Sequence, residues 1–185
     1  MNGKPKSGTH AIYPGSFDPL TLGHMDVIGR ASAIFESVLV AVVVNPQKRE
    51  PLFTLPERKA MITAAAAEAH LENVEVVGFR GLLADFVRTR DVDVIVKGLR
   101  VVSDFESEMA TAYMNRSLVG VDTVFLPSDP RYSFISSTLV KEVFLLGGTI
   151  DDYVPAALLR TMREKRAQLH QDSSTLSETN PSPGG

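Results

Sequence analysis

Positions 37–44 carry SVLVAVVV, a continuous run of apolar residues that is rich in valine. A strand with one face in water alternates apolar and polar residues, whereas a strand covered on both faces shows an unbroken apolar run. Strands covered on both faces are typical of parallel sheets, because the helices that connect parallel strands pack on the two faces. The run therefore predicts a buried strand inside an α/β fold.

Strand-like and helix-like segments alternate along the rest of the chain. Capping boxes support two helix starts, with Thr54 followed by Glu57 and Ser103 followed by Glu106. The alternation predicts a Rossmann-like, open five-stranded parallel sheet with helices on both faces and right-handed crossovers. The predicted strands are 10–13, 37–44, 73–79, 92–98 and 122–127, and the predicted helices are 23–35, 54–69, 82–90, 103–118, 136–147 and 155–168.

One folded domain, at 9–170, is expected to account for most of the 185 residues. Residues 1–8 are polar with glycine and proline, and Leu176 is the single large apolar residue of 171–185. A segment with so little apolar surface cannot offset the entropy lost on ordering. We therefore expect a flexible N-terminus at 1–8 and a disordered tail at 171–185.

Charge and composition exclude several classes of function. The net charge is −3, so the chain has no overall field that would attract nucleic acid or an anionic membrane. It has no cysteine, no apolar run of the roughly 18 residues that span a bilayer, and no apolar segment near its start that is typical of a signal peptide. These features predict a cytoplasmic enzyme or binding protein without a nucleic-acid or membrane partner.

Ligands of open parallel sheets bind beyond the carboxyl ends of the strands, so the loops after the strands are candidate sites. The first loop lies within AIYPGSFDPLTLGH, at 11–24. Gly15 would let a ligand approach, the amides of Ser16 and Phe17 would face it, and the next helix would direct its positive end there. Thr21 and His24 share a helix face. The loop suits a nucleoside triphosphate without a Walker motif, although a helix-capping turn would equally explain His24 taken alone.

Three further strand-end loops carry cations and hydroxyls. Lys48 follows the buried strand, Lys97 and Arg100 belong to VKGLR at the end of the fourth predicted strand, and Ser136–Thr138 begin a predicted helix. Each loop also has a plain structural explanation: solvated cations, an ion-paired lysine or a simple helix cap. Their gathering at one edge of a sheet, in a chain of net negative charge, favours a polyphosphate site.

These motifs also resemble a known family. GSFDPLTLGH is similar to the signature of the T/H-x-G-H nucleotidylyltransferases, here Thr21 to His24, a superfamily that includes the class I aminoacyl-tRNA synthetases. That signature implies nucleotidyl transfer without specifying the acceptor. The motifs YPGSFDP, VKGLR, DFE, MNR and YSFISSTLVKEV, in this order, resemble the phosphopantetheine adenylyltransferase family over about residues 10–160.

The resemblance implies that ATP and 4'-phosphopantetheine react to give dephospho-coenzyme A and pyrophosphate, the penultimate step of coenzyme A synthesis. It further implies Mg²⁺ on the ATP phosphates, a homohexamer, and feedback inhibition by coenzyme A. The acceptor phosphate is already a nucleophile, and the sequence shows no activated serine or carboxylate dyad. Direct in-line attack, with catalysis by positioning and charge stabilisation, is therefore expected, with no metal held by protein ligands alone.

The resemblance assigns roles to individual residues. The catalytic group would be His24 on the α-phosphate, Lys48 on the acceptor phosphate and Arg100 on the triphosphate. Lys97 stands where some relatives carry arginine and loses the guanidinium fork, and Ser16 replaces a threonine of some members. The ATP site would also contain Ser16, Phe17, Gly98, Leu99, Glu108, Tyr132, Ser133, Phe134, Ile135, Ser136, Ser137 and Thr138. The acceptor site would contain Ser16, Lys48, Leu82, Leu83, Lys97, Met114 and Asn115.

Three alternatives stay open at this stage. The same chemistry could act on nicotinate mononucleotide or glycerol phosphate, and the acceptor-side residues weigh against this. A non-catalytic nucleotide-binding module would not require His24, Lys48 and Arg100 together. A basic interaction helix at 160–168, RTMREKRAQ, is the third, although its charges are typical of a solvated face.

Overall fold

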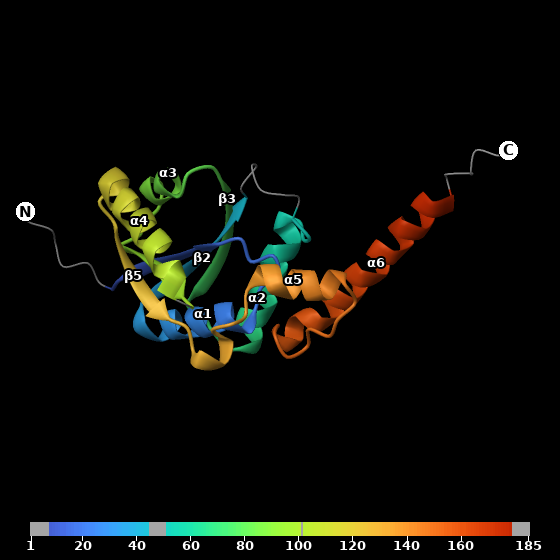
Figure 1. Cartoon of the computed structure of the whole chain (residues 1–185). Coiled ribbons are helices and arrows are strands. Elements are labelled where there is room, and N and C mark those ends of the chain that lie inside the picture. Colours follow the sequence, from blue (N-terminus) through green and yellow to red (C-terminus); the bar gives the residue numbers. More distant parts are fainter. Residues whose placement is uncertain (1–7, 45–50, 101, 179–185) are drawn as a thin grey trace, which may run out of the picture.

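The computed structural model describes residues 8–44, 51–100 and 102–178 of the chain (Figure 1). Its centre is a five-stranded, all-parallel sheet with the strand order β3-β2-β1-β4-β5. This confirms the predicted Rossmann-like sheet. The strands are β1 His10–Gly15, β2 Ser37–Val44, β3 Val74–Arg80, β4 Val94–Leu99 and β5 Asp122–Pro127.

Alternate residues of the strands enter two separate cores. Tyr13 and Val40, paired in the β1–β2 register, belong to the larger core, whereas the neighbouring Ile12 and Ala41 belong to the smaller core on the opposite face. A strand whose two faces are both covered has no solvent side on which to place polar residues. This explains the unbroken apolar run of β2 and confirms the strand predicted at 37–44.

Helices cover both faces of the sheet (Figure 1). Val27 of α1, Met61 of α2, Val140 of α5 and Met162 of α6 pack in the larger core. Val87 of α3 is buried in the smaller core, on the face that α4 also covers. The helices are α1 Leu22–Ile34, α2 Leu55–Glu68, α3 Leu83–Arg88, α4 Val102–Val119, α5 Ser137–Leu145 and α6 Leu159–Glu178, with short 3₁₀ turns η1 Pro130–Tyr132 and η2 Ala156–Leu158.

The helix starts agree with the capping signals at two places and differ at a third. Thr54 and Glu57 form the predicted capping box of α2, and Ser136 is the N-cap of α5. The prediction that Ser103 caps its helix was wrong, because α4 already begins at Val102 and Ser103 lies within its first turn. The predicted and observed starts differ by one or two residues, which is the usual spread at helix ends.

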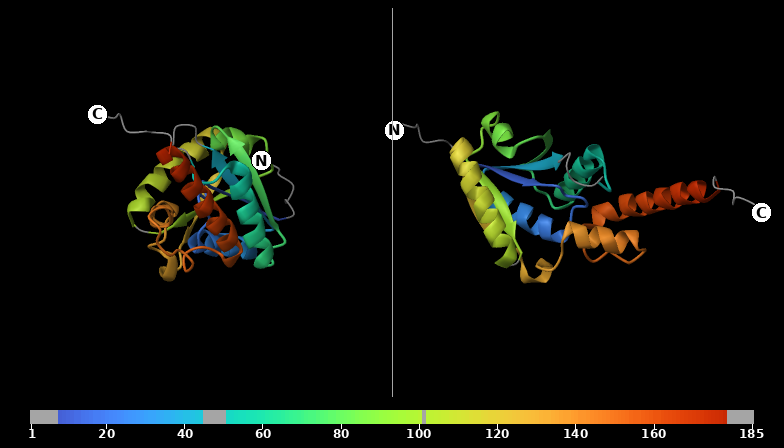
Figure 2. Two further views of the ribbon diagram at one scale, coloured as in Figure 1. Left: turned by 90° about the vertical axis from the view of Figure 1, so that its right-hand side faces the viewer. Right: turned by 45° about the horizontal axis from the view of Figure 1, so that its top comes forward.

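The last helix is longer than predicted. An end near residue 168 and a disordered segment from 171 were expected, but α6 continues to Glu178. Met162 and the partly buried Leu169 pack against the larger core, and once a helix is nucleated each further residue adds a hydrogen bond at small cost. Figure 2 shows α6 projecting beyond the sheet. Residues 1–7 and 179–185 lie outside the described ranges, and within those ranges no helix has the length and apolarity to cross a bilayer.

Candidate active site

Two adjoining cavities open at the carboxyl ends of the strands near β1 and β4. The strand order changes direction here. From β1 the sheet continues through β2 and β3 on one side, and through β4 and β5 on the other. Such switch points are where open α/β sheets bind ligands. The first cavity has a volume of about 330 Å³ and the second about 630 Å³. Their shared wall consists of Pro14, Gly15, Ser16, Lys97, Ser137 and Thr138.

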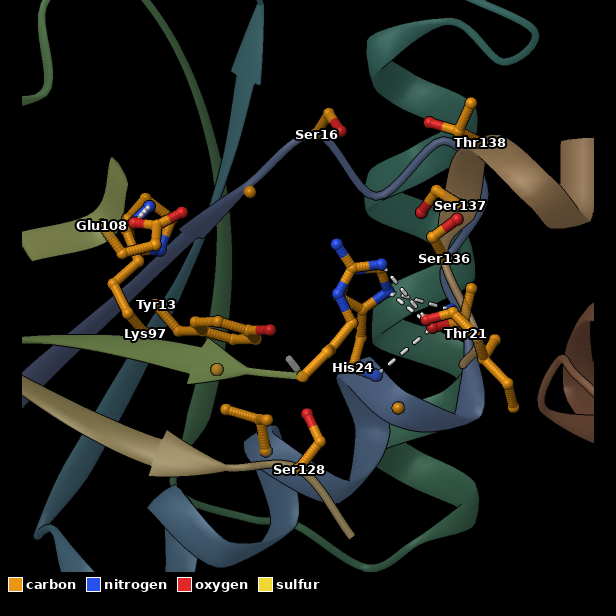
Figure 3. A pocket seen from close by; sticks show the side chains of 17 residues that line it. Tyr13, Ser16, Thr21, His24, Lys97, Glu108, Ser128, Ser136, Ser137 and Thr138 are labelled. Atoms are coloured by element: carbon orange, nitrogen blue, oxygen red, sulfur yellow. Dashed lines mark hydrogen bonds and ion pairs between the residues drawn. The ribbon is translucent and has the colours of Figure 1, made fainter. Parts of the chain in front are cut away.

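His24 lies on the wall of the first cavity, at the start of α1 (Figure 3). The backbone N–H of Thr21 donates to its Nδ1 at 3.1 Å, and the backbone N–H of His24 donates to Thr21 Oγ1 at 3.4 Å. His24 thus takes the glutamate's place in a capping box. Its ring also packs edge-on against the buried Phe17, with 5.0 Å between ring centroids. Capping and cavity lining, which the sequence left as alternatives, are therefore both roles of this residue.

The contacts of His24 fix its protonation state. Because a backbone N–H can only donate, Nδ1 is the acceptor and the proton of the neutral ring is on Nε2. Burial, and to a smaller extent the Arg100 guanidinium, lower the pKa of His24 to about 4. The ring is therefore neutral at pH 7 and presents an N–H donor rather than a base.

We predict that His24 keeps the neutral Nε2–H form down to about pH 5 in the ligand-free protein. Its pKa of about 4 lies below the ordinary value of 6.5, so between these two pH values the unfolded chain takes up a proton that the folded chain does not. Folding stability should accordingly fall as the pH decreases through this window. Two-dimensional ¹H–¹⁵N NMR of the imidazole nitrogens measures the tautomer directly, and a His24 resonance that titrates near pH 6.5 would contradict this assignment.

The end of β4 brings cations to the same cavity. Lys97 Nζ lies 3.0 Å from Glu108 Oε2 of α4, which supplies the partner expected for an ammonium at the end of an apolar strand. Arg100 lines the cavity beyond it. Between them, Gly98 allows β4 to approach α1 closely, since a Cβ at this position would lie 2.9 Å from Val27 Cγ2. The first cavity therefore combines two cations with a close backbone approach.

The N-terminus of α5 forms the opposite wall (Figure 3). Ser136 Oγ accepts the backbone N–H of Leu139 at 3.1 Å, so Ser136 alone provides the helix cap. Ser137 Oγ donates to the carbonyl of Pro19 at 2.7 Å and joins α5 to the first loop. Thr138 lines both cavities. The amides of a first helical turn and these hydroxyls can together hold an anion.

The second cavity combines an apolar wall with charge. Phe79, Leu82 and Leu83 form its apolar side, and the buried Asn115 adds an amide. Its charged lining residues are Asp18, Arg58, Lys97 and Lys141. A ligand with an apolar arm and an anionic end matches this arrangement.

Comparison with known proteins agrees with the geometry. A family model described as cytidylyltransferase-like matches residues 12–143. A phosphopantetheine adenylyltransferase of Heliobacterium modesticaldum is 52% identical over 85% of this chain and 92% of its own, and one of Corynebacterium diphtheriae is 48% identical over 84% and 96%. The chain belongs to the phosphopantetheine adenylyltransferase family. The resemblance carried by the sequence motifs is thereby confirmed.

Solved structures of other adenylyltransferases share the fold of this phosphopantetheine adenylyltransferase family member. A putative nicotinate-nucleotide adenylyltransferase of Vibrio parahaemolyticus has a TM-score of 0.60 at 20% identity, covering 86% of this chain and 92% of that one. A bifunctional NMN adenylyltransferase/ADP ribose pyrophosphatase of Francisella tularensis has a TM-score of 0.69 at 14% identity, covering 92% of this chain and 54% of that one. At such identities the likeness concerns the fold alone.

Most site residues that the phosphopantetheine adenylyltransferase motifs implied lie together at the two cavities. Those on the first cavity are Ser16, His24, Lys97, Gly98, Arg100, Glu108, Ile135, Ser136, Ser137 and Thr138. Those on the second are Ser16, Leu82, Leu83, Lys97, Asn115, Ser137 and Thr138. Lys48 lies outside the described residues.

Several implied residues do not line either cavity. Phe17 is fully buried beneath the first loop with a φ of 48°, and Phe134 and Met114 are exposed at 61% each. Neither cavity is lined by Leu99, Tyr132 or Ser133. Tyr132 nevertheless packs near the cavity, since a Cβ at Gly23 would lie 3.5 Å from Tyr132 Cβ.

The cavities also contain residues that the sequence did not single out. Tyr13 and Ser128 line the first cavity, and Asp18, Arg58 and Lys141 line the second. Ser128 and Asp18 lie in loops that follow strands, which the predicted fold had already indicated as candidate sites. Lys141 could have been found by its spacing of four from Ser137 on the predicted helix. Arg58 lies inside an alanine-rich helix, where nothing distinguishes it from a solvated cation.

Proposed function

We propose that this protein transfers the adenylyl group of ATP to 4'-phosphopantetheine, producing dephospho-coenzyme A and pyrophosphate. The observation that carries the proposal is the shared wall of the two cavities. A nucleotide in the first cavity and an acceptor in the second would meet along this wall, beside His24 and Lys97. Family membership at about half identity supports the same acceptor.

The geometry suits direct displacement without a covalent enzyme intermediate. An oxygen of the acceptor phosphate attacks the α-phosphorus of ATP, the bond from that phosphorus to the bridging oxygen of the β-phosphate breaks, and pyrophosphate leaves. The acceptor oxygen needs no deprotonation, which agrees with a neutral His24 whose Nδ1 is already engaged. Its Nε2–H can donate to an oxygen of the α-phosphate as charge builds there, while Lys97 compensates the approach of two anions.

We propose that ATP enters as its magnesium complex. The described residues contain no group of three or more His, Asp or Glu side chains that could hold a metal ion. Phosphate oxygens of the nucleotide are suitable ligands for Mg²⁺, which commonly retains several waters and few protein ligands. The ion would therefore belong to the substrate rather than to the chain.

An acceptor panel tests the proposed function. The purified protein is mixed with Mg²⁺ and ATP or CTP, together with 4'-phosphopantetheine, nicotinate mononucleotide or glycerol 3-phosphate, and pyrophosphate release is followed. We expect release to be fastest with ATP and 4'-phosphopantetheine, with a product of the mass of dephospho-coenzyme A. Preference for another acceptor would refute the assignment, and no release with any pair would indicate a non-catalytic nucleotide-binding protein.

We further propose a homohexamer that coenzyme A inhibits, acting in the cytoplasm where ATP is available. Exposed apolar side chains on α4, such as Phe105 at 45% and Tyr113 at 65%, support an association of subunits. Coenzyme A carries the same pantetheine arm as the proposed product, which supports competition for the second cavity. Sedimentation equilibrium and a coenzyme A titration in the pyrophosphate assay measure these two properties.

A further inference from the structure

We propose that Lys141 is an additional acceptor-binding residue, whose ammonium is positioned by Asp18 to receive the acceptor's phosphate. The inference deepens the proposed function and rests on it. Lys141 lies on α5 and lines the second cavity, and its Nζ is 2.8 Å from Asp18 Oδ2.

The helix geometry directs Lys141 toward the shared wall. Lys141 follows Thr138 by three residues and Ser137 by four, so it shares a face of α5 with each of them, and all three line the second cavity. Side chains on an α-helix lean toward its N-terminus. The long side chain of Lys141 therefore extends back toward Ser137 and Thr138, which belong to both cavities, and not away from the proposed point of reaction.

Asp18 is a rigid anchor for this ammonium. Its carboxylate is buried and accepts the backbone N–H groups of Leu52 at 3.0 Å and Phe53 at 2.9 Å. Asp18 follows Ser16 by two positions in the first loop. The ion pair thus holds Lys141 beside the shared wall. Because an ammonium has three N–H donors, pairing with one carboxylate leaves donors for a phosphate.

Charge around the second cavity favours an anionic ligand. Arg58 is 3% exposed, and its guanidinium donates to the carbonyls of Ser16 at 2.8 Å and Val43 at 3.4 Å. Lys141 lines the same cavity and is part-buried, with 27% of its side chain exposed. Buried charges generally add little to folding stability compared with well-packed apolar residues. Cations retained on the wall of a cavity are better explained by the phosphate that the cavity would receive.

The test compares Lys141→Met with the parent enzyme on 4'-phosphopantetheine and on unphosphorylated pantetheine. We expect the KM for 4'-phosphopantetheine, and its dissociation constant by calorimetry without ATP, to rise about tenfold, the order expected for a charge-assisted hydrogen bond. The dissociation constant of pantetheine and the KM for ATP should stay within about twofold, and Lys141→Arg should retain most affinity. An equal loss for both acceptors, or unchanged 4'-phosphopantetheine binding, would overturn the proposal.

Asp18→Asn tests the positioning role. The uncharged amide no longer forms the ion pair with Lys141, and one of the backbone N–H groups of Leu52 and Phe53 loses its acceptor. We therefore expect a lower thermal midpoint together with the loss specific to the phosphorylated acceptor, and little further loss of acceptor affinity in the double variant with Lys141→Met. If Asp18→Asn weakened the binding of ATP and pantetheine as much as that of 4'-phosphopantetheine, Asp18 would have a structural role only. That result would overturn its proposed role in positioning Lys141. Lys165→Met is the matched control, because Lys165 also pairs with a carboxylate, Glu57 at 3.4 Å, but lines neither cavity.

Failure of the proposed function would be distinguishable from failure of this inference. If the acceptor panel identifies a different phosphorylated acceptor, the proposed function is wrong, and the Lys141 comparison is made with that acceptor and its dephosphorylated form. If 4'-phosphopantetheine is the substrate but Lys141→Met binds it as tightly as the parent, Lys141 has no role in binding and the function stands.

Discussion

Replacing His24 by alanine is expected to lower turnover by about 10²–10³-fold, the usual cost of losing one preorganised donor to transition-state charge. The neutral ring donates through Nε2 because Nδ1 is occupied by the backbone of Thr21. That hydrogen bond should strengthen as negative charge accumulates on the oxygens around the α-phosphorus. The KM for ATP should therefore change little, and the loss should appear in kcat.

A second variant separates catalysis from helix capping. His24→Gln keeps a side chain that can accept the Thr21 N–H, since glutamine serves the same position in a capping box. We expect its thermal midpoint to stay near that of the parent while turnover stays at least about tenfold lower. His170→Ala, at an exposed position on α6, is the control for loss of a histidine. Turnover of His24→Ala within about twofold of the parent would exclude the proposed role.

Local sequence signals were sufficient to predict the helices and strands, and to predict the edge of the sheet at which the site lies. The apolar run of β2 indicated burial on two faces, and Val40 on one face and Ala41 on the other are both 0% exposed. In a parallel sheet the carboxyl ends of the strands lie at one edge, so the loops after β1 and β4 could be placed together from the predicted fold alone. Thr21 and His24 were placed on one face by spacing alone, and the structure joins them in a capping box.

Interactions between distant segments could not be obtained in this way. Asp18 bonds to Leu52 and Phe53, and Arg58 bonds to the carbonyl of Ser16, across sequence separations that no local pattern encodes. The same limit applies to the length of α6, where Met162 and Leu169 pack against the larger core and the helix continues past the end near 168 that the sequence predicted. The second cavity is therefore where the sequence predicted least, because its charged wall is assembled from four separate segments, the loop after β1, α2, β4 and α5.

Lys97→Met is expected to lower kcat/KM for 4'-phosphopantetheine by about 10²-fold or more. Lys97 lines both cavities, so its ammonium is near the point where the acceptor phosphate and the α-phosphate must approach one another. Two unit charges about 4 Å apart interact with roughly 4 kcal/mol at an effective dielectric constant of about 20, and the ammonium offsets repulsion of this order. Its loss also leaves the Glu108 carboxylate without its partner on the wall of the first cavity, which adds repulsion toward the nucleotide.

Two further variants decide between this role and simple ion pairing. Lys97→Arg keeps the charge and should stay within about tenfold of the parent in steady-state kinetics. Glu108→Gln removes the other half of the ion pair and keeps the ammonium, so it should affect the KM for ATP more than kcat. If Lys97→Met and Glu108→Gln lost activity equally, the ammonium would serve only to neutralise Glu108. A much larger loss in Lys97→Met is expected, because only that variant removes the cation that the proposed mechanism uses between the two phosphates.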